Sequence, residues 1–104
     1  MALMQITIIP LGTASPSVGE YVAEVENYLR HRGIEHQLQD MGTVLHAEPA
    51  TLFRLAAEIH NLPFARGVQR VVTQITIDDR RDTERGLGDK QRAVLQRLDR
   101  EAIP

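Results

Sequence analysis

Three polar side chains, Thr43, His46 and Glu48, lie within six residues of one another. A hydroxyl, an imidazole and a carboxylate can together donate and accept hydrogen bonds to a small polar molecule. They follow Gln39-Asp40-Met41-Gly42, which is typical of a tight turn, and Gly42 can adopt the positive φ that other residues resist. We therefore expect a β-hairpin whose exit forms one wall of a small-molecule site.

Ser17 is a second candidate for ligand contact. It precedes Glu20 by three residues, which is the spacing of a helix capping box. The same position at a helix N-terminus offers free N–H groups to a polar or anionic ligand. The sequence leaves both roles open for Ser17.

The residue types and spacings needed for other chemistry are missing. The chain has no cysteine, which excludes disulfides, thiolate metal sites and a cysteine nucleophile. The histidines lack the HxH or HxxxH spacing of a zinc site; they are His31, His36, His46 and His60. No serine lies in a nucleophile elbow, and the glycines form no phosphate-binding loop. We expect no catalytic residue, no metal and no cofactor.

Composition and charge set wider limits. The 104 residues suffice for one domain, residues 1–104, and 42% hydrophobic with 25% charged residues is a globular composition. A net charge of −2 gives no clustered positive field for nucleic acid. No apolar run is long enough to span a membrane, and the N-terminal segment is typical of a strand rather than a signal peptide. We therefore expect a cytoplasmic protein.

Alternating acidic and basic residues in 78–85 predict ion pairs that neutralise one another rather than an acid/base pair.

Hydrophobic periodicity predicts the elements that position these residues. Strand-like alternation covers residues 3–9, the hairpin arms 35–38 and 43–47, and residues 68–77. Helical spacing covers residues 17–32 and 51–62. A third helical segment follows, and its apolar stripe is Leu87, Gln91, Val94, Leu95 and Leu98. Gly33 and Pro63 are expected to end the first two helices. The order predicts an α+β, ferredoxin-like βαββαβ unit with both helices on one sheet face, followed by an additional C-terminal helix.

The other face of that sheet is predicted to be polar but mostly uncharged. It would carry Gln5, Thr7, Gln37, Gln39, Gln74 and Thr76. A solvated face is one interpretation; a subunit interface is the one we favour, because solvated sheets usually carry more Lys and Glu. The third helix also needs a partner for its apolar stripe, which a dimer or tetramer would supply.

Several motifs together resemble the small thiamine-binding protein family of ferredoxin-like fold. The matching segments and residues are IPLGT (9–13), SVGEYVAEV (17–25), Gly33, MGTV (41–44), Glu48, His60, Phe64, Gly67, RVVT (70–73), IDDRRD (77–82) and Asp89-Lys90. MGT after a short strand and IDDRRD at the end of the last strand are together fairly specific.

This resemblance implies a non-enzymatic protein that binds thiamine or its hydroxymethylpyrimidine half and assembles as a homo-oligomer, often a tetramer. By the same resemblance, Ser17, Thr43 and Glu48 would supply polar contacts, and Tyr21 an aromatic surface. Such a ligand needs a few fixed hydrogen-bonding groups in an otherwise apolar pocket.

The chain departs from the family pattern after MGTV. His46 and Ala47 stand where the family usually has an acidic residue and then glycine. Imidazole accepts through one nitrogen only and repels a cation when protonated, so His46 would weaken thiamine binding or shift the preference to a neutral or anionic pyrimidine-like molecule. The alternative function is an oligomeric interaction or scaffold protein with a degenerate pocket.

Overall fold

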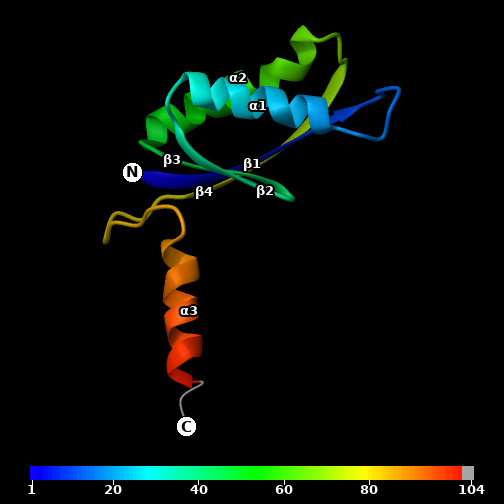
Figure 1. Ribbon diagram of the computed structural model, residues 1–104. Coiled ribbons are helices and arrows are strands. Elements are labelled where there is room, and N and C mark those ends of the chain that lie inside the picture. Colours follow the sequence, from blue (N-terminus) through cyan, green and yellow to red (C-terminus); the bar gives the residue numbers. More distant parts are fainter. Residues whose placement is uncertain (102–104) are drawn as a thin grey trace.

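The computed structural model describes residues 1–101, which form four strands and three helices. In chain order they are β1 (Ala2–Leu11), α1 (Gly19–His31), β2 (Glu35–Gln39), β3 (Gly42–Ala47), α2 (Pro49–Ala65), β4 (Arg70–Asp78) and α3 (Asp89–Glu101). All strand pairs are antiparallel, in the order β2-β3-β1-β4. Helices α1 and α2 cover one face of this sheet (Figure 1), so the predicted ferredoxin-like fold with an additional C-terminal helix is confirmed.

The core lies between the sheet and these two helices. Alternate residues of β1 and β3 point toward the helices, as the two-residue period of a strand requires. They meet the apolar stripes of α1 and α2, and the largest fully buried side chains are Met4, Leu29, Leu45, Leu52, Ile59 and Pro63. Part of each helical stripe therefore forms the core.

Helix α1 ends where the sequence predicted but begins later. Gly33 has φ +65°, its N–H donates to the carbonyl of Arg30, and the N–H of Ile34 donates to that of Leu29. These two bonds make a Schellman C-cap. The predicted capping box is wrong, because Val18 occupies the N-cap position and no side chain caps the helix. Ser17 lies one residue outside the helix end, and its own N–H donates to Ser15 Oγ at 3.1 Å.

Helix α2 is longer than predicted at both ends. It begins at Pro49, whose fixed φ suits the first helical position. Pro63 does not end it, because the ring is fully buried in the core and the chain stays helical to Ala65. Pro63 removes one helical hydrogen bond and crowds the carbonyl four residues before it, costs that burial of its ring in the core offsets. Gly67, with φ +89°, then makes the turn into β4.

The hairpin between β2 and β3 has a two-residue loop, Asp40-Met41, and continues into α2 as predicted. Gly42 does not use the positive φ that is open to glycine, since it is not among the positive-φ residues. Glycine is required there for another reason. A Cβ at position 42 would lie 2.7 Å from Thr7 Oγ1 and 3.1 Å from the carbonyl oxygen of Ile6, both on β1. The Thr7 hydroxyl also donates to the carbonyl of Met41 at 2.7 Å, so β1 holds the hairpin tip closely.

The sheet face opposite α1 and α2, which we call the open face, carries the predicted amides and hydroxyls. Strand register aligns Gln37, Val44, Gln5 and Thr76 in one row across all four strands. The neighbouring row toward the N-terminus contains Glu35, His46, Leu3 and Asp78. The centre of the open face is therefore uncharged, and charges lie toward its ends.

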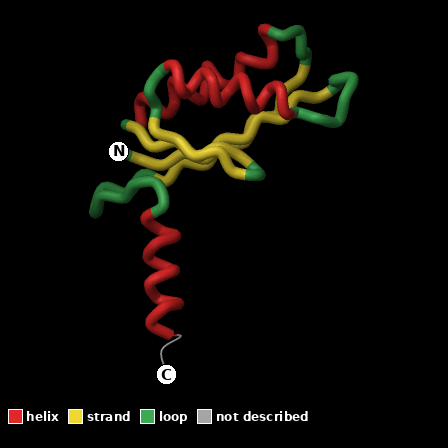
Figure 2. The backbone as a smooth tube through the Cα atoms, in the orientation of Figure 1, coloured by secondary structure: helices red, strands yellow, loops and turns green. Residues whose placement is uncertain are grey.

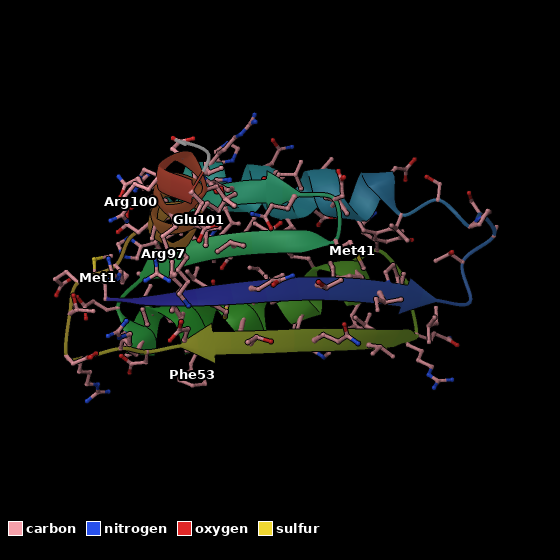
Figure 3. All side chains as sticks on the ribbon, turned by 90° about the horizontal axis from the view of Figure 1, so that it is seen from below. Met1, Met41, Phe53, Arg97, Arg100 and Glu101 are labelled. Carbon is pink, nitrogen blue, oxygen red and sulfur yellow. The ribbon has the colours of Figure 1, made fainter. Side chains whose placement is uncertain are left out.

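Helix α3 projects away from the open face instead of packing on the domain (Figures 1 and 2). Seen from that face, α3 appears end-on, near Met1 and far from Met41 at the hairpin tip (Figure 3). Its first turn is tied to the sheet by an ion pair between Lys90 and Asp78, and the Asp89 carboxylate accepts the N–H of Gly86 at 2.7 Å. No side chain of α3 is buried.

The connection from β4 to α3 forms the expected ion pairs. Arg80 donates two hydrogen bonds to Asp82, and Arg81 donates two to Asp79. The hydrogen bonds from Arg80 lower the pKa of Asp82 to about 2, with a smaller contribution from a backbone N–H. These groups are exposed, and they neutralise one another without forming an acid/base pair.

We predict that Gly42→Ala destabilises the fold by about 1–3 kcal/mol, because the methyl group must displace β1 backbone. Gly19→Ala is the matched control: its Cβ would meet only Ser17 Oγ, at 3.9 Å, so stability should be unchanged or slightly raised. Urea unfolding followed by circular dichroism measures both. Equal stabilities of the two variants would contradict the close contact at Gly42.

We predict that Arg80→Gln raises the pKa of Asp82 from about 2 toward its ordinary 3.8, measured by carbon NMR of the carboxyl group. Because the folded-state pKa is depressed, the pair stabilises the folded state above the ordinary pKa, and this contribution is lost as the pH falls toward 2. Arg97→Gln on α3 serves as the control and should leave the titration unchanged. An unchanged titration in Arg80→Gln would assign the shift to the backbone bond.

Candidate functional site

The five predicted ligand-binding residues do not meet in one site. Thr43 and His46 are three residues apart on β3, so their side chains project from opposite faces of the sheet. Thr43 is buried beneath the helices, whereas His46 lies on the open face. Glu48 is exposed, next to a shallow pocket formed with Met1 and the β4–α3 connection. Their roles as ligand contacts stay predictions.

His46 is tied into the open face. Its Nδ1–H donates to Glu35 Oε2 at 3.0 Å, and its Nε2 is buried without a hydrogen-bond partner. A Cβ at Gly86 would lie 3.9 Å from His46 Cε1, so the segment leading into α3 covers the imidazole. Only 13% of the His46 side chain is exposed, which leaves little room for direct contact with a ligand in one chain.

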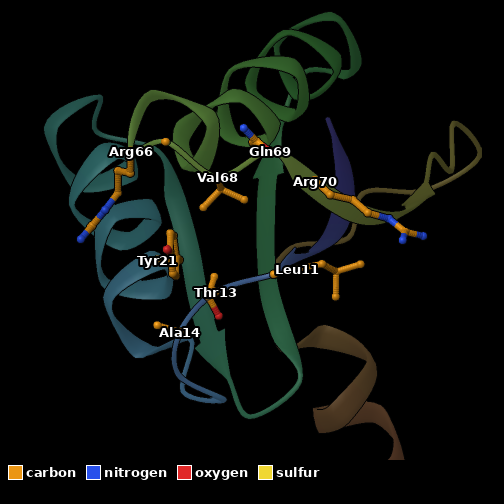
Figure 4. A pocket seen from close by; sticks show the side chains of 10 residues that line it. Leu11, Thr13, Ala14, Tyr21, Arg66, Val68, Gln69 and Arg70 are labelled. Atoms are coloured by element: carbon orange, nitrogen blue, oxygen red, sulfur yellow. The ribbon is translucent and has the colours of Figure 1, made fainter.

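Tyr21 lines a pocket of about 510 Å³ at the end of the sheet farthest from Met1, which we call the end pocket (Figure 4). The Arg66 guanidinium lies 5.1 Å from the centroid of the Tyr21 ring. Arg66 also pairs with Glu24 and Glu20, and the hydrogen bond to Glu24 raises its pKa.

The guanidinium groups of Arg66 and Arg70 lie on opposite sides of the end pocket and point outward (Figure 4). The charge of Arg66 is already balanced by two carboxylates, and the pocket is open and mostly polar. A small molecule with an apolar ring finds no enclosed apolar wall there. The end pocket therefore suits a buried ring poorly.

A second cavity, of about 340 Å³, lies between α1, β1 and the tip of the β2–β3 hairpin, and we call it the α1–hairpin cavity. Its apolar lining includes Ile6, Ile8, Val18, Val22, Val25 and Ile59. Asp40, Met41 and Thr43 line it from the hairpin side. Thr7 of β1 and Gln74 of β4, both on the open face, border it as well. An apolar chamber with a few polar groups around it is the usual composition of a ligand site.

Sequence reasoning misses this cavity because its valines have the same helical spacing as a core stripe. That spacing assigns Val18, Val22 and Val25 to the core, yet only Val25 is fully buried. One signal is present: two of the segments that carry the family resemblance, SVGEYVAEV and MGTV, both contribute to its wall. Ser17 precedes the lining residue Val18 but does not line the cavity itself.

A buried polar network stands behind Thr43. The Thr43 hydroxyl donates to Glu26 Oε2 at 3.2 Å, and Glu26 Oε1 lies 3.4 Å from His36 Nε2. The opposite ring nitrogen, Nδ1 of His36, donates to the carbonyl of Ile34 at 2.6 Å. Sequence reasoning also misses Glu26, although its position four residues after Val22 and three before Leu29 places it on the buried face of α1.

Neither a metal-binding cluster nor a membrane-spanning helix is found within the described residues. Within residues 1–101, no three His, Asp or Glu side chains lie close enough together to hold a metal ion. None of the helices in that described part of the chain has both the length and the apolar character needed to cross a bilayer.

Comparison with known proteins identifies the family. A sequence profile described as "Thiamine-binding protein" matches residues 4–95. The chain is 43% identical to the UPF0045 protein YqgV of Bacillus subtilis (strain 168), over 94% of this chain and 98% of that protein. It is 41% identical to the UPF0045 protein encoded in the glkA 3′ region of Staphylococcus xylosus, over 94% and 95% of the two chains.

Solved structures share the fold. The hypothetical protein MJ1052 of Methanocaldococcus jannaschii superimposes with a TM-score of 0.80 at 28% identity, covering 91% of this chain and 96% of that one. TM0486 of Thermotoga maritima, whose name proposes a role in thiamine biosynthesis or salvage, superimposes with a TM-score of 0.74 at 14% identity, covering 89% and 97%. At that identity the second match concerns the fold alone. By the sequence profile and the UPF0045 relatives, the chain belongs to the thiamine-binding protein family.

Proposed function

We propose that the protein binds thiamine or a hydroxymethylpyrimidine-like molecule, without catalysis, in the α1–hairpin cavity. The observation that carries this proposal is the cavity itself, whose wall combines both of the motif segments noted above. Its volume of about 340 Å³ falls at the lower end of the range for small-molecule sites, roughly 300–1,000 Å³. The family to which the chain belongs supplies the ligand class.

The lining fits the two halves of such a ligand. The valines of α1 and the isoleucines of β1 offer an apolar enclosure to a flat pyrimidine ring. Thr43 offers a hydroxyl on the hairpin side for a polar substituent of that ring. The carboxylate of Asp40, which is exposed at the hairpin loop, can balance the positive charge of a thiazolium that remains near the surface.

Other predicted contacts require a different location. His46 and Glu48 are reached by a ligand only at the hairpin exit, where a second copy of the chain would have to complete the site. This is the competing proposal for the same function, and His46 would then set the ligand preference.

We predict that isothermal titration calorimetry detects thiamine binding to the wild-type chain and a loss of at least about tenfold in affinity for Val22→Phe, because the larger ring occupies the cavity. Ala23→Phe places the same ring at the adjacent, exposed position of α1 and should leave binding unchanged.

His46→Glu tests the competing location in the same assay. Binding that responds to His46→Glu and ignores Val22→Phe would move the site to the hairpin exit. A wild-type chain that binds neither thiamine nor hydroxymethylpyrimidine would reject the binding function in both locations and favour the scaffold alternative.

We further propose that the chain assembles as a homo-oligomer through α3 and the open face. Val94, Leu95 and Leu98 form an apolar stripe on α3, and each is more than half exposed within one chain. An amphipathic helix that projects alone into water leaves that stripe unpaired. The uncharged centre of the open face, with Val44 and Val72 among amides and hydroxyls, is a surface that a second copy can cover without burying charge.

We predict that light scattering at micromolar concentration gives a dimer or tetramer mass for the wild-type chain. Leu95→Asp should shift the mass toward the monomer, because it places a carboxylate in the buried stripe. Gln96→Asp adds the same charge one residue further along α3, outside the stripe, and should preserve the assembly. A monomeric wild-type mass would contradict the proposal.

A further inference from the structure

In the hydrogen-bond network behind the α1–hairpin cavity, the donor of the first bond, between His36 and Ile34, can be assigned. The carbonyl of Ile34 can only accept, so the His36 nitrogen 2.6 Å away, Nδ1, must carry a hydrogen. This carbonyl belongs to the residue that closes the Schellman turn of α1, so its position is set by the end of the helix. His36 is thereby held with Nε2 toward Glu26.

Glu26 meets His36 through one of its two carboxyl oxygens. His36 Nε2 lies 3.4 Å from Glu26 Oε1, and the two side chains are mostly buried, 13% and 11% exposed. This contact places Oε1 beside β2 and leaves Oε2 for Thr43.

The second carboxyl oxygen of Glu26, Oε2, accepts a hydrogen bond from the Thr43 hydroxyl at 3.2 Å. A hydroxyl has one hydrogen and two lone pairs, so Thr43 keeps only acceptor capacity for any other partner.

We propose that Glu26 is a positioning residue that fixes Thr43 as a hydrogen-bond acceptor toward the α1–hairpin cavity. At this contact the cavity then favours a pyrimidine with an exocyclic amino group, which donates, over the corresponding oxo compound, which presents a second acceptor. Glu26 does not line the cavity and acts through Thr43 alone. This inference rests on the proposed function, because it specifies the ligand class of the same cavity.

The test compares thiamine with its 4-oxo analogue, oxythiamine, by calorimetry. The wild-type chain should prefer thiamine by about tenfold or more, since the oxo group would face an unpaired acceptor. In Glu26→Leu the Thr43 hydrogen is free to turn into the cavity, and the affinity ratio should fall by about tenfold. Glu26→Gln is the conservative variant that restores the preference, because its amide can donate to His36 and still accept from Thr43.

Thr43 provides a second pair of variants should Glu26→Leu not fold. Thr43→Ser should keep the preference for thiamine, and Thr43→Val, which has the same shape without a hydroxyl, should lose it. A folded Glu26→Leu or Thr43→Val that retains the wild-type ratio would overturn the role of Glu26 and leave the binding function intact. A wild-type chain that binds neither compound would overturn the proposed function and this inference together.

Discussion

The pairing of β1 on both sides is the constraint on which the rest of the structure depends. β1 aligns with β3 from Ala2 to Ile6 and with β4 along nearly its whole length. Because its residues alternate between faces, this one register decides which side chains enter the core and which form the open face. A slip by one residue would exchange Met4, Ile6 and Ile8 for Leu3, Gln5 and Thr7. Pro10 is compatible with β1 because at this residue the strand extends beyond its pairing with β3 and pairs with β4 only.

The sequence predicts the elements well because each carries its own period and its own stop signal. The alternation of β1 and the Gly33 terminator act locally, and the structure confirms both. The errors arise where a distant segment decides. Pro63 continues a helix because the core buries its ring, and Gly42 is glycine because β1 approaches it. The residues that neighbour Pro63 and Gly42 along the chain do not predict either contact.

The candidate site is only partly accessible to the same reasoning. Thr43, His46 and Glu48 are close in sequence, but a strand separates residues an odd number of steps apart onto opposite faces. That rule, applied to residues 43–47 as a strand, is enough to place Thr43 and His46 on different faces. The α1–hairpin cavity is a different case, because an apolar wall and an apolar core have the same spacing. A void between α1 and β1 depends on how far the packed layers stand apart, and periodicity does not encode that distance.

A buried carboxyl group such as Glu26 costs free energy unless every partner is supplied, and packing would have tolerated an apolar residue there. Its partners are Thr43 on β3 and His36 on β2, and His36 in turn donates to the Ile34 carbonyl at the end of α1. A network that joins these elements fixes the position of the hairpin against α1, and the cavity opens between those two parts. On the other side of the sheet, Thr7 holds the same hairpin through the carbonyl of Met41. The cavity is also bordered by Thr7, Gln39 and Gln74 of the open face, so ligand binding and assembly would meet at the hairpin. Val22 and Leu95, on different helices, nevertheless allow the two to be perturbed separately.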